Sequence, residues 1–512
     1  MPVVFRDSLE SLLITSSEYI DYDGLERIRK AYEFTVESNK RYDMLRFSGE
    51  PSIVHPLSVA EQLVKWRLDS DTIAAGILHD TIEDPEVHAV QLHATFGEAV
   101  TRMVDGVSKL KKFELPKKAN PDTAFMWKIF LATASDIRVA LIKIADRLHN
   151  MRTLESMPGY KTIKNCIETE KIFIPLAERL GMEALVEEMQ DICFQYLHPN
   201  EYSNLIEYID NIIDSESEIL ESSIEKLRPS LSALNIEYQI KPFYYSHSHI
   251  NRIMDETNPM TMIKTGLIEI TVPDDEECYL ALRAVHKTFR NFSMNFQDII
   301  AFPSTAMKRM LQTVVLAPGG LPMVTRILSR EMKHINRYGI VPFIAEKHTL
   351  KRSDFLEERV NWLQKTITEN RALVGEKDQA GLVDIMSRTL TEKETFVFYA
   401  NRLVELPESS SVLDFAYSIG PEIGNHISAV FINRQEVTLD YIPKRFDQLS
   451  FETNPAGSPR VEWLECVNTL EAQIQIKTKL RELDRYEAIA EGRGALLKRA
   501  RENGLCPSGR IE

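Results

Sequence analysis

Apolar residues in the first two hundred positions recur three and four residues apart, which is the period of an amphipathic helix. Asp69 stands directly before one apolar run, so we expect it to cap a helix that carries His79 and Asp80 near its end. His55 and Pro56 open another such run, and proline suits the first turn of a helix. The pattern therefore predicts that this whole stretch is helical.

Further along the chain, short β-rich runs alternate with helical ones. The runs IEYQIKPFYY, LIEITV and TVVLAP indicate strands, as do TFVFYANRLVEL and SAVFINRQEVTL on either side of the helical SVLDFAYSI. We expect a multidomain protein, with an all-α domain over 1–200, an α+β domain over 201–347, a helical connector over 348–388, a small α+β module over 389–455 and a helical segment over 456–512.

Composition favours a large cytoplasmic protein. The 512 residues suffice for roughly three or four domains, and 44% of them are hydrophobic. The charge balance, 61 − 76 = −15, argues against general binding to nucleic acid or to anionic membranes. The five cysteines form no CxxC pair, and neither a signal peptide nor an apolar run of about 18 residues is recognisable. We therefore expect a soluble protein without membrane contact.

Four residues that bind metal well are spread over the helical region. They are His55, His79, Asp80 and Asp146, and each lies in an apolar context where it is costly without a partner. Two imidazoles and two carboxylates form a mixed nitrogen and oxygen site for a borderline or hard divalent ion. The set predicts a metal centre.

An acid pair follows the central ligands. If the helix continues, Glu83 lies one turn beyond His79, and Asp84 one turn beyond Asp80. Carboxylates in that place could orient and deprotonate a water molecule. The pattern indicates a metal-dependent hydrolase.

A polar stripe runs along the segment DIRVALIKIADRLHNMRTL beside its apolar face. Lys143, Asp146, Asn150 and Thr153 recur at helical spacing, and such a stripe is usually a solvated face. We favour a binding face, because Asp146 completes the ligand set and the other three side chains suit phosphate and sugar. We leave His149 out of the predicted site, since a lone histidine is more often packed or exposed than functional.

At these residues the chain resembles the long RelA/SpoT homologue family, which makes and degrades the guanosine alarmone (p)ppGpp. The segments RFSGEPSIVHPLSVA, ILHDTIED, FGEAVTRMVDGVSKL and PLAERLGM match its N-terminal HD-type hydrolase domain in order and spacing. The resemblance implies one Mn²⁺, bound by His55, His79, Asp80 and Asp146. It also implies that Glu83 and Asp84 act on the hydrolytic water.

Substrate contacts follow from the same resemblance. It implies nucleotide binding by Arg46, Ser48, Asn150, Thr153 and Lys161, and we expect Lys143, with Arg147 or Arg152, to neutralise the departing pyrophosphate. Phe47 departs from the family, which commonly has a basic residue there.

The α+β domain resembles a degraded copy of the family's synthetase. Gln297, Ser304, Ala306 and Arg309 replace residues of the motif FKDYIAxPKxNGYQSLH, and Lys264 and Glu269 replace the acid and the arginine of DxxAxR. Val324 stands at the position of the essential glutamate. Pyrophosphoryl transfer needs acids and metal-neutralised phosphates, so we expect a pseudo-synthetase over 201–347.

The module over 389–455 resembles the family's TGS domain, with a β-grasp-like fold. Gly420 stands where ribosome-associated members have a histidine that contacts tRNA, which argues against binding to tRNA or the ribosome. The family implies regulatory protein partners at the TGS domain and the helical region over 456–512. Its last regulatory domains have no counterpart in this sequence.

The sequence thus predicts Mn²⁺-dependent hydrolysis of the 3′-pyrophosphate of (p)ppGpp to GDP or GTP and pyrophosphate, which controls alarmone levels in the stringent response. Two alternatives remain open, an HD phosphohydrolase for another nucleotide and a non-catalytic regulatory scaffold that binds the alarmone. The Glu83 and Asp84 pair argues against the scaffold, since binding alone needs no water-activating acids.

Overall fold

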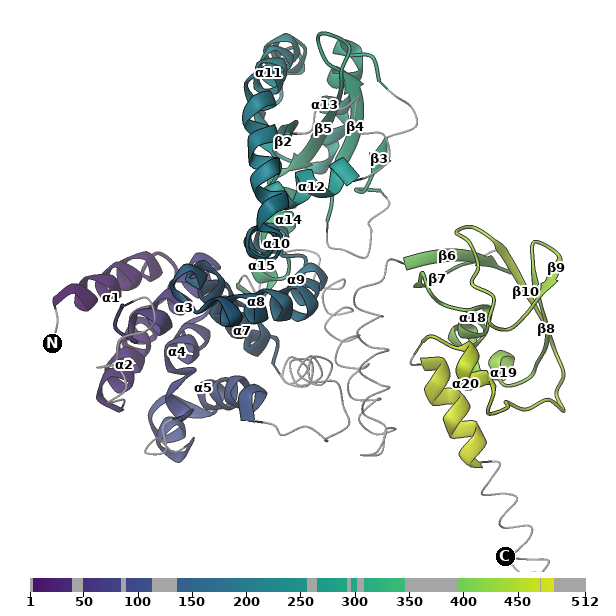
Figure 1. The fold of residues 1–512 in the computed structure, drawn as a ribbon, viewed down its shortest axis with the longest axis horizontal. Helices are drawn as coiled ribbons and strands as arrows, with labels where there is room; N and C mark the ends of the chain where they lie inside the picture. The colour runs from purple at the N-terminus through teal and green to yellow at the C-terminus, as the bar shows by residue number, and fades with distance from the viewer. Residues whose placement is uncertain are drawn as a thin grey trace, which may run out of the picture. The chain divides into compact units, whose positions relative to one another are not determined.

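The computed structural model describes residues 3–38, 49–83, 89–112, 136–255, 265–291, 296–301, 308–345, 394–400, 402–469 and 471–482. The chain divides into two compact units. The first combines Met1–Lys117 with Ala124–Ile367, and the second combines Lys118–Thr123 with Thr368–Glu512. Figure 1 shows the elements of both.

Every regular element described before residue 239 is helical, as the apolar period predicts (Figure 1). These helices are α1 (Val3–Ser16), α2 (Tyr22–Ser38), α3 (Val54–Lys65), α4 (Ser70–Leu78), α5 (Ala89–Lys112), α7 (Ile137–Arg152), α8 (Gly159–Glu168), α9 (Ile174–Arg179), α10 (Glu183–Leu197) and α11 (Pro199–Ser232). The buried faces of α3, α4 and α7 supply much of the helical core.

Helix α4 begins where the sequence predicts and ends earlier. The Asp69 side chain accepts a hydrogen bond from the backbone N–H of Thr72 at 2.9 Å, so Asp69 is the N-cap. The helix ends at Leu78, His79 is its C-cap, and Thr81–Glu83 forms a separate 3₁₀ turn. The expected helical stacking of Glu83 over His79 is therefore wrong, because the backbone changes its winding between them.

Helix α7 decides between the two interpretations of its polar stripe. Lys143 is 6% exposed and Asp146 is 4% exposed, so these two side chains face the interior. A solvated face would leave both in water. The two charged residues of the stripe therefore lie in the helical core, where they need partners, whereas Asn150 and Thr153 are half-buried.

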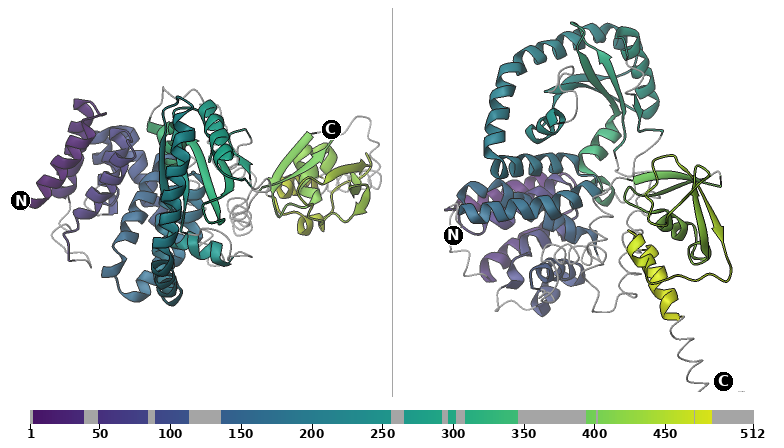
Figure 2. Two further views of the ribbon diagram at one scale, coloured as in Figure 1. Left: turned by 90° about the horizontal axis from the view of Figure 1, so that it is seen from above. Right: turned by 45° about the vertical axis from the view of Figure 1, so that its right-hand side comes forward.

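The second half of the first unit is a mixed sheet with helices on one face (Figure 2). The strand order is β1-β2-β5-β4-β3, and β2 and β5 are parallel while the other neighbours are antiparallel. Residues of α11, α13 and α14 pack with the strands in one apolar core. The elements are β1 (Gln239–Tyr244), α12 (His247–Asp255), β2 (Gly266–Val272), α13 (Asp275–Thr288), β3 (Gln297–Asp298), β4 (Leu311–Leu316), β5 (Pro322–Ser329), α14 (Arg330–Tyr338) and α15 (Val341–Ala345).

The sheet region is attached to the helical region through α10 and the turn before it. Asp191 on α10 accepts hydrogen bonds from the backbone N–H and the hydroxyl of Ser248 at 2.8 and 2.6 Å, at the start of α12. Beyond α14, the N–H of Ile340 donates to the carbonyl of Leu180 at 2.9 Å. These contacts fix the sheet region against the helices.

The second unit is a small α+β module around a sheet of order β7-β6-β10-β8-β9. Its elements are β6 (Glu394–Tyr399), β7 (Arg402–Pro407), α18 (Val412–Ile419), α19 (Pro421–Gly424), β8 (Ile427–Ile432), β9 (Gln435–Val437), β10 (Gln448–Thr453) and α20 (Trp463–Cys466), and residues 471–482 are also helical. The expected fold class of an all-α domain, two α+β domains and a helical C-terminal segment is confirmed. The expected connector over 348–388 lies outside the described residues.

A buried carboxylate joins the last helix to this module. Asp414 on α18 accepts hydrogen bonds from the N–H and the hydroxyl of Thr469 at 2.7 and 2.6 Å, and from the N–H of Asn468 at 2.9 Å. Ala472 and Ile476 of the following helix are fully buried in the core of the module. The structural unit around the TGS-like sheet thus continues into the helix over 471–482.

Gly339 gives a test of the attachment between the sheet and the helices. It has φ +60° and ψ −123°, and a methyl group there would overlap the carbonyl oxygen of Leu180. We expect Gly339→Ala to destabilise the first unit by more than the roughly 1–3 kcal/mol of backbone strain alone, with a lower thermal unfolding temperature. Gly319→Ala is the control, because Gly319 has φ +89° and nothing lies within 4 Å of an added methyl. Equal losses in both variants would contradict the close approach.

Candidate metal centre

Three candidate ligands meet where α3 begins and α4 ends. His55 comes from the first turn of α3, and His79 and Asp80 follow the last turn of α4. One ligand atom from each of the three lies within 4.8 Å of those from the other two. The sequence separates these residues by an entire helix, and the packing of α3 on α4 brings them together.

The ring of His79 is held in one orientation. Its Nδ1 lies 2.7 Å from the carbonyl oxygen of Gly76, and this contact requires the proton on Nδ1. Nε2 then presents a lone pair towards Asp80, whose Oδ1 lies 3.3 Å away. Within the described part of the chain, this buried Nε2 has no hydrogen-bond partner. An orphaned, buried imidazole nitrogen between carboxylates is the environment of a metal ligand.

Asp146 on α7 lies outside this group of three and adjoins it through His55. Its Oδ1 lies 3.1 Å from Nε2 of His55 and accepts a hydrogen bond from Asn150 Nδ2 at 2.8 Å. Its Oδ2 accepts from Lys143 Nζ at 2.5 Å. Burial raises the pKa of Asp146, but Lys143 and the two histidines outweigh it and hold the pKa well below its usual range. Asp146 is therefore an anion despite its burial.

The carboxylates also act on His79. Burial lowers the pKa of this imidazole, but Asp80 and Asp146 outweigh it, and the pKa of His79 is raised above its ordinary value. The pocket thus favours a positive charge at Nε2. A divalent cation would supply that charge, and the donor set of two imidazoles and two carboxylates fits such an ion.

His149 contacts this centre, although we left it out of the site predicted from the sequence. Its Nδ1 lies 2.9 Å from Nδ1 of His55, and the two rings are tilted by 56°. If His55 presents Nε2 to a metal ion, its Nδ1 carries the proton and His149 accepts the hydrogen bond. Its place three residues after Asp146 was the available signal, because residues i and i+3 share a helix face.

The remaining polar residues of α7 have different surroundings. The hydroxyl of Thr153 donates to the carbonyl of His149 at 3.1 Å, at the end of the helix. Arg147 pairs with Glu168 at 2.8 Å, and Arg152 pairs with Glu188 at 2.5 Å. Both arginines thus connect α7 to neighbouring segments rather than to the ligand cluster.

Lys161 lies in the first turn of α8, and its side chain is half-buried. The remaining predicted site residues have no described side chain. The backbone of Glu83 is described and its side chain is not. Arg46, Ser48 and Asp84 lie outside the described residues.

Two family models match the chain. An HD domain matches residues 31–183, and a TGS domain matches residues 397–442. The first match contains all four candidate ligands. The second covers β7, α18 and β8 of the second unit.

Curated proteins are similar over nearly the whole chain. A guanosine-3′,5′-bis(diphosphate) 3′-pyrophosphohydrolase of Aquifex aeolicus is 34% identical over 98% of this chain and 70% of its own length. A GTP pyrophosphokinase of Myxococcus xanthus is 31% identical over 96% of this chain and 65% of its own length. The bifunctional (p)ppGpp synthase/hydrolase SpoT of Escherichia coli is 28% identical over 96% of this chain and 69% of its own length. All three relatives are thus longer than this chain.

The fold, the ligand cluster and the domain matches together define the class of protein. It has an HD-type hydrolase fold with a possible histidine and aspartate metal site, and α+β domains follow. With 34% identity to a relative of which it covers 70%, the chain belongs to the long RelA/SpoT homologue family. The resemblance that the motifs indicate is confirmed. Among the described helices, none is both long and apolar enough to cross a membrane.

The contact between His149 and His55 can be tested through metal affinity. We expect His149→Leu to weaken Mn²⁺ binding by roughly tenfold or more, because His55 loses the acceptor that orients its ring. His149→Gln keeps an acceptor and should lose less. Calorimetric titration with Mn²⁺ measures both, with the exposed His198→Gln as control. Unchanged affinity in His149→Leu would show that other contacts orient His55.

Proposed function

We propose that this protein hydrolyses the 3′-pyrophosphate of (p)ppGpp, giving GDP or GTP and pyrophosphate, with Mn²⁺ as the cofactor. The observation that carries the proposal is the buried cluster in which the unpartnered Nε2 of His79 faces Asp80, within an HD-type domain. The Aquifex relative is named for this reaction, which supports the choice of substrate.

In this proposal His55, His79, Asp80 and Asp146 would hold the ion. When bound, such an ion lowers the pKa of a coordinated water molecule and neutralises negative charge near the phosphorus. The two imidazoles favour Mn²⁺ over Mg²⁺, which prefers an all-oxygen environment. Lys143, for which we expected a contact to the departing pyrophosphate, is buried and lies 2.5 Å from Asp146, so it would balance the charge of that carboxylate and keep it aligned.

Two acidic residues, Glu83 and Asp84, would act on the attacking water molecule. Glu83 and Asp84 come three and four residues after Asp80 in the sequence. We assign them to orienting and deprotonating the attacking water. Arg46, Ser48, Asn150, Thr153 and Lys161 would bind the nucleotide, an assignment that rests on the resemblance to the family.

We further propose that the sheet region has no synthetase activity. Val324 lies in an apolar cluster with Leu267 and Val314, and has no group that could act as an acid or bind magnesium. Glu269 is buried and paired with Lys333 at 2.7 Å, so its charge is already neutralised. Both observations support a pseudo-synthetase, whereas the Myxococcus relative is named a pyrophosphokinase.

The cellular location and the binding partners are proposals as well. We propose a cytoplasmic location, which the unpaired thiols of Cys166, Cys193 and Cys278 support. Regulatory proteins would bind the TGS-like module and the helix after it. Gly420 follows the end of α18 and has no side chain to contact tRNA.

A product assay with labelled ppGpp tests the activity and its metal. We expect chelation to abolish release of pyrophosphate, and Mn²⁺ to restore it better than Mg²⁺. The same protein incubated with ATP and GDP should make no ppGpp. Equal hydrolysis with Mg²⁺ alone would contradict the metal assignment. Steady synthesis would contradict the pseudo-synthetase, and hydrolysis of another nucleotide alone would contradict the substrate.

Variants of Glu83 and Asp84 distinguish metal binding from activation of the attacking water. Changing both acids to their amides (Glu83→Gln, Asp84→Asn) keeps their shape and removes the bases, so single-turnover hydrolysis should fall roughly 10²- to 10⁴-fold. Bound Mn²⁺ per chain should stay unchanged. Asp80→Ala is the matched control, in which metal content and hydrolysis should fall together. Loss of metal from the amide variant would make the two acids ligands rather than bases.

A further inference from the structure

Two aspartates cap the N-termini of α4, which ends next to His79 and Asp80, and of α7, which carries Asp146. Asp69 caps α4, and Asp136 caps α7 by accepting a hydrogen bond from the N–H of Arg138 at 3.0 Å. His79 follows Asp69 by ten residues (79 − 69), and Asp146 follows Asp136 by the same number (146 − 136). Both caps thus stand at the same distance along the chain from a candidate ligand.

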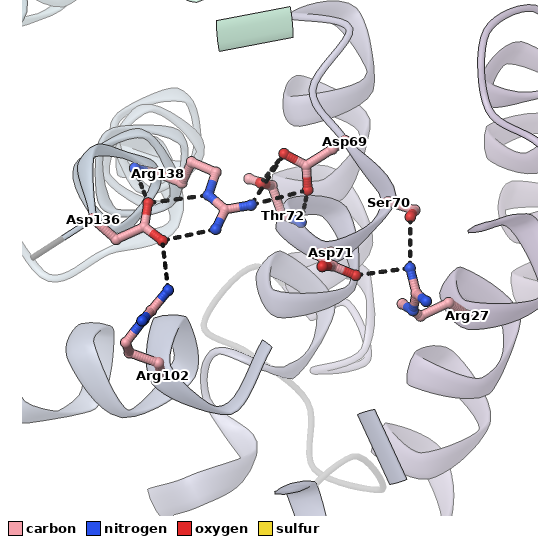
Figure 3. A network of polar contacts seen from close by, with 8 residues as sticks. All are labelled: Arg27, Asp69, Ser70, Asp71, Thr72, Arg102, Asp136 and Arg138. Carbon is pink, nitrogen blue, oxygen red and sulfur yellow. Dashed lines mark hydrogen bonds and ion pairs between the residues drawn. The ribbon is translucent and has the colours of Figure 1, made fainter. Parts of the chain in front are cut away.

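One guanidinium joins the two caps, as Figure 3 shows. Arg138 donates from Nε and Nη2 to the two oxygens of Asp136, at 3.0 and 2.8 Å. Its Nη1 donates to Asp69, at 3.2 Å from Oδ2. The fork of the guanidinium is therefore shared between two helix starts, a geometry that lysine cannot reproduce.

The network is partly buried and carries balanced charge. The side chain of Asp136 is 9% exposed and that of Arg138 is 18% exposed. Burial raises the pKa of Asp136, but the hydrogen bonds from Arg138 outweigh it and lower the pKa. Arg102 on α5 adds a weaker contact to Asp136 at 3.9 Å. Without Arg138, two caps of like charge would face each other across the helices.

Few direct contacts join α4 to α7, whereas each packs extensively on α3. Apolar burial has no fixed donor and acceptor positions, so the guanidinium adds directional contacts between the two helix starts. A helix rises about 1.5 Å per residue, so a displacement at the caps moves the ligands some 15 Å away by a similar amount.

We propose that Arg138 is a positioning residue that sets the axial register of α4 and α7 and so fixes the position of His79 and Asp80 relative to Asp146. The inference rests on the proposed metal site and adds a residue remote from it. Arg27 ties α4 to α2 through Asp71 at 2.8 Å, so the start of α4 is fixed on a second side (Figure 3).

The experiment compares Mn²⁺ affinity in five variants of the full chain by calorimetric titration. Arg138→Gln removes the link, and Asp69→Asn removes its other end while keeping a good helix cap. The double variant closes the cycle. Arg29→Gln is the matched control, because Arg29 pairs with Glu10 at 3.0 Å between α1 and α2, which carry no candidate ligand. Circular dichroism sets a temperature at which all variants are folded.

We expect both single variants to bind Mn²⁺ roughly tenfold more weakly, because removing a residue that positions metal ligands typically lowers metal affinity by about this factor. The double variant should lose no more than either single one, and Arg29→Gln should bind like the unchanged protein. Arg138→Lys should recover only part of the affinity, because its ammonium cannot serve both caps.

Three results would overturn the inference: unchanged affinity in folded Arg138→Gln, additive losses in the double variant, or an equal loss in Arg29→Gln. Full recovery in Arg138→Lys would overturn the bridging geometry. If the unchanged protein binds Mn²⁺ and hydrolyses ppGpp while the variants bind normally, only this inference fails. If the unchanged protein does neither, the proposed function fails with it.

Discussion

The helical region contains ionised groups in a place where water is largely excluded. Transfer of a carboxylate from water to an apolar interior costs far more than a single contact returns, so it persists only with several partners in good geometry. Asp146 has three, a lysine, an asparagine and a histidine, and two of them lie on its own helix. The fold of α3, α4 and α7 is thus constrained by the need to bring the third partner, His55, from another helix.

That constraint connects the site to the rest of the first unit. Arg152, at the end of α7, pairs with Glu188 on α10, and Asp191 on the same helix caps α12 of the sheet region. Helix α10 therefore contacts both the helix that carries Asp146 and the sheet. Within the sheet region, buried Glu269 pairs with Lys333 at 2.7 Å. The contacts of α10 connect this region mechanically to the helix that carries Asp146.

The second unit also contains a buried carboxylate with several hydrogen-bond donors, but this carboxylate is not a candidate metal ligand. Asp414 is buried and accepts hydrogen bonds from Ser411, Asn468 and Thr469, so its charge is spread over donors from two segments. A carboxylate satisfied in this way fixes the position of the chain entering the last helix. In both units, buried aspartates hold helix ends in place, whether or not they belong to a site.

The sequence by itself determined the elements and the chemistry of the ligands. The spacing of apolar residues predicted the helices, Asp69 predicted a cap, and the types of His55, His79, Asp80 and Asp146 predicted a metal site. These are local properties, because a helix and its cap depend on residues within a few positions of each other.

Only the tertiary structure decided which distant groups meet. The partner of Arg138 lies 69 residues away at Asp69, and the partner of His55 lies 94 residues away at His149. Helical spacing places His149 on the same face as Asp146, but it does not show which residue of another helix His149 contacts. The exact end of α4 at Leu78 was not readable either, since Ile82 keeps a four-residue spacing from Leu78. Such contacts arise when whole helices pack against one another. The apolar period of a single helix does not show which residues of other helices it will contact.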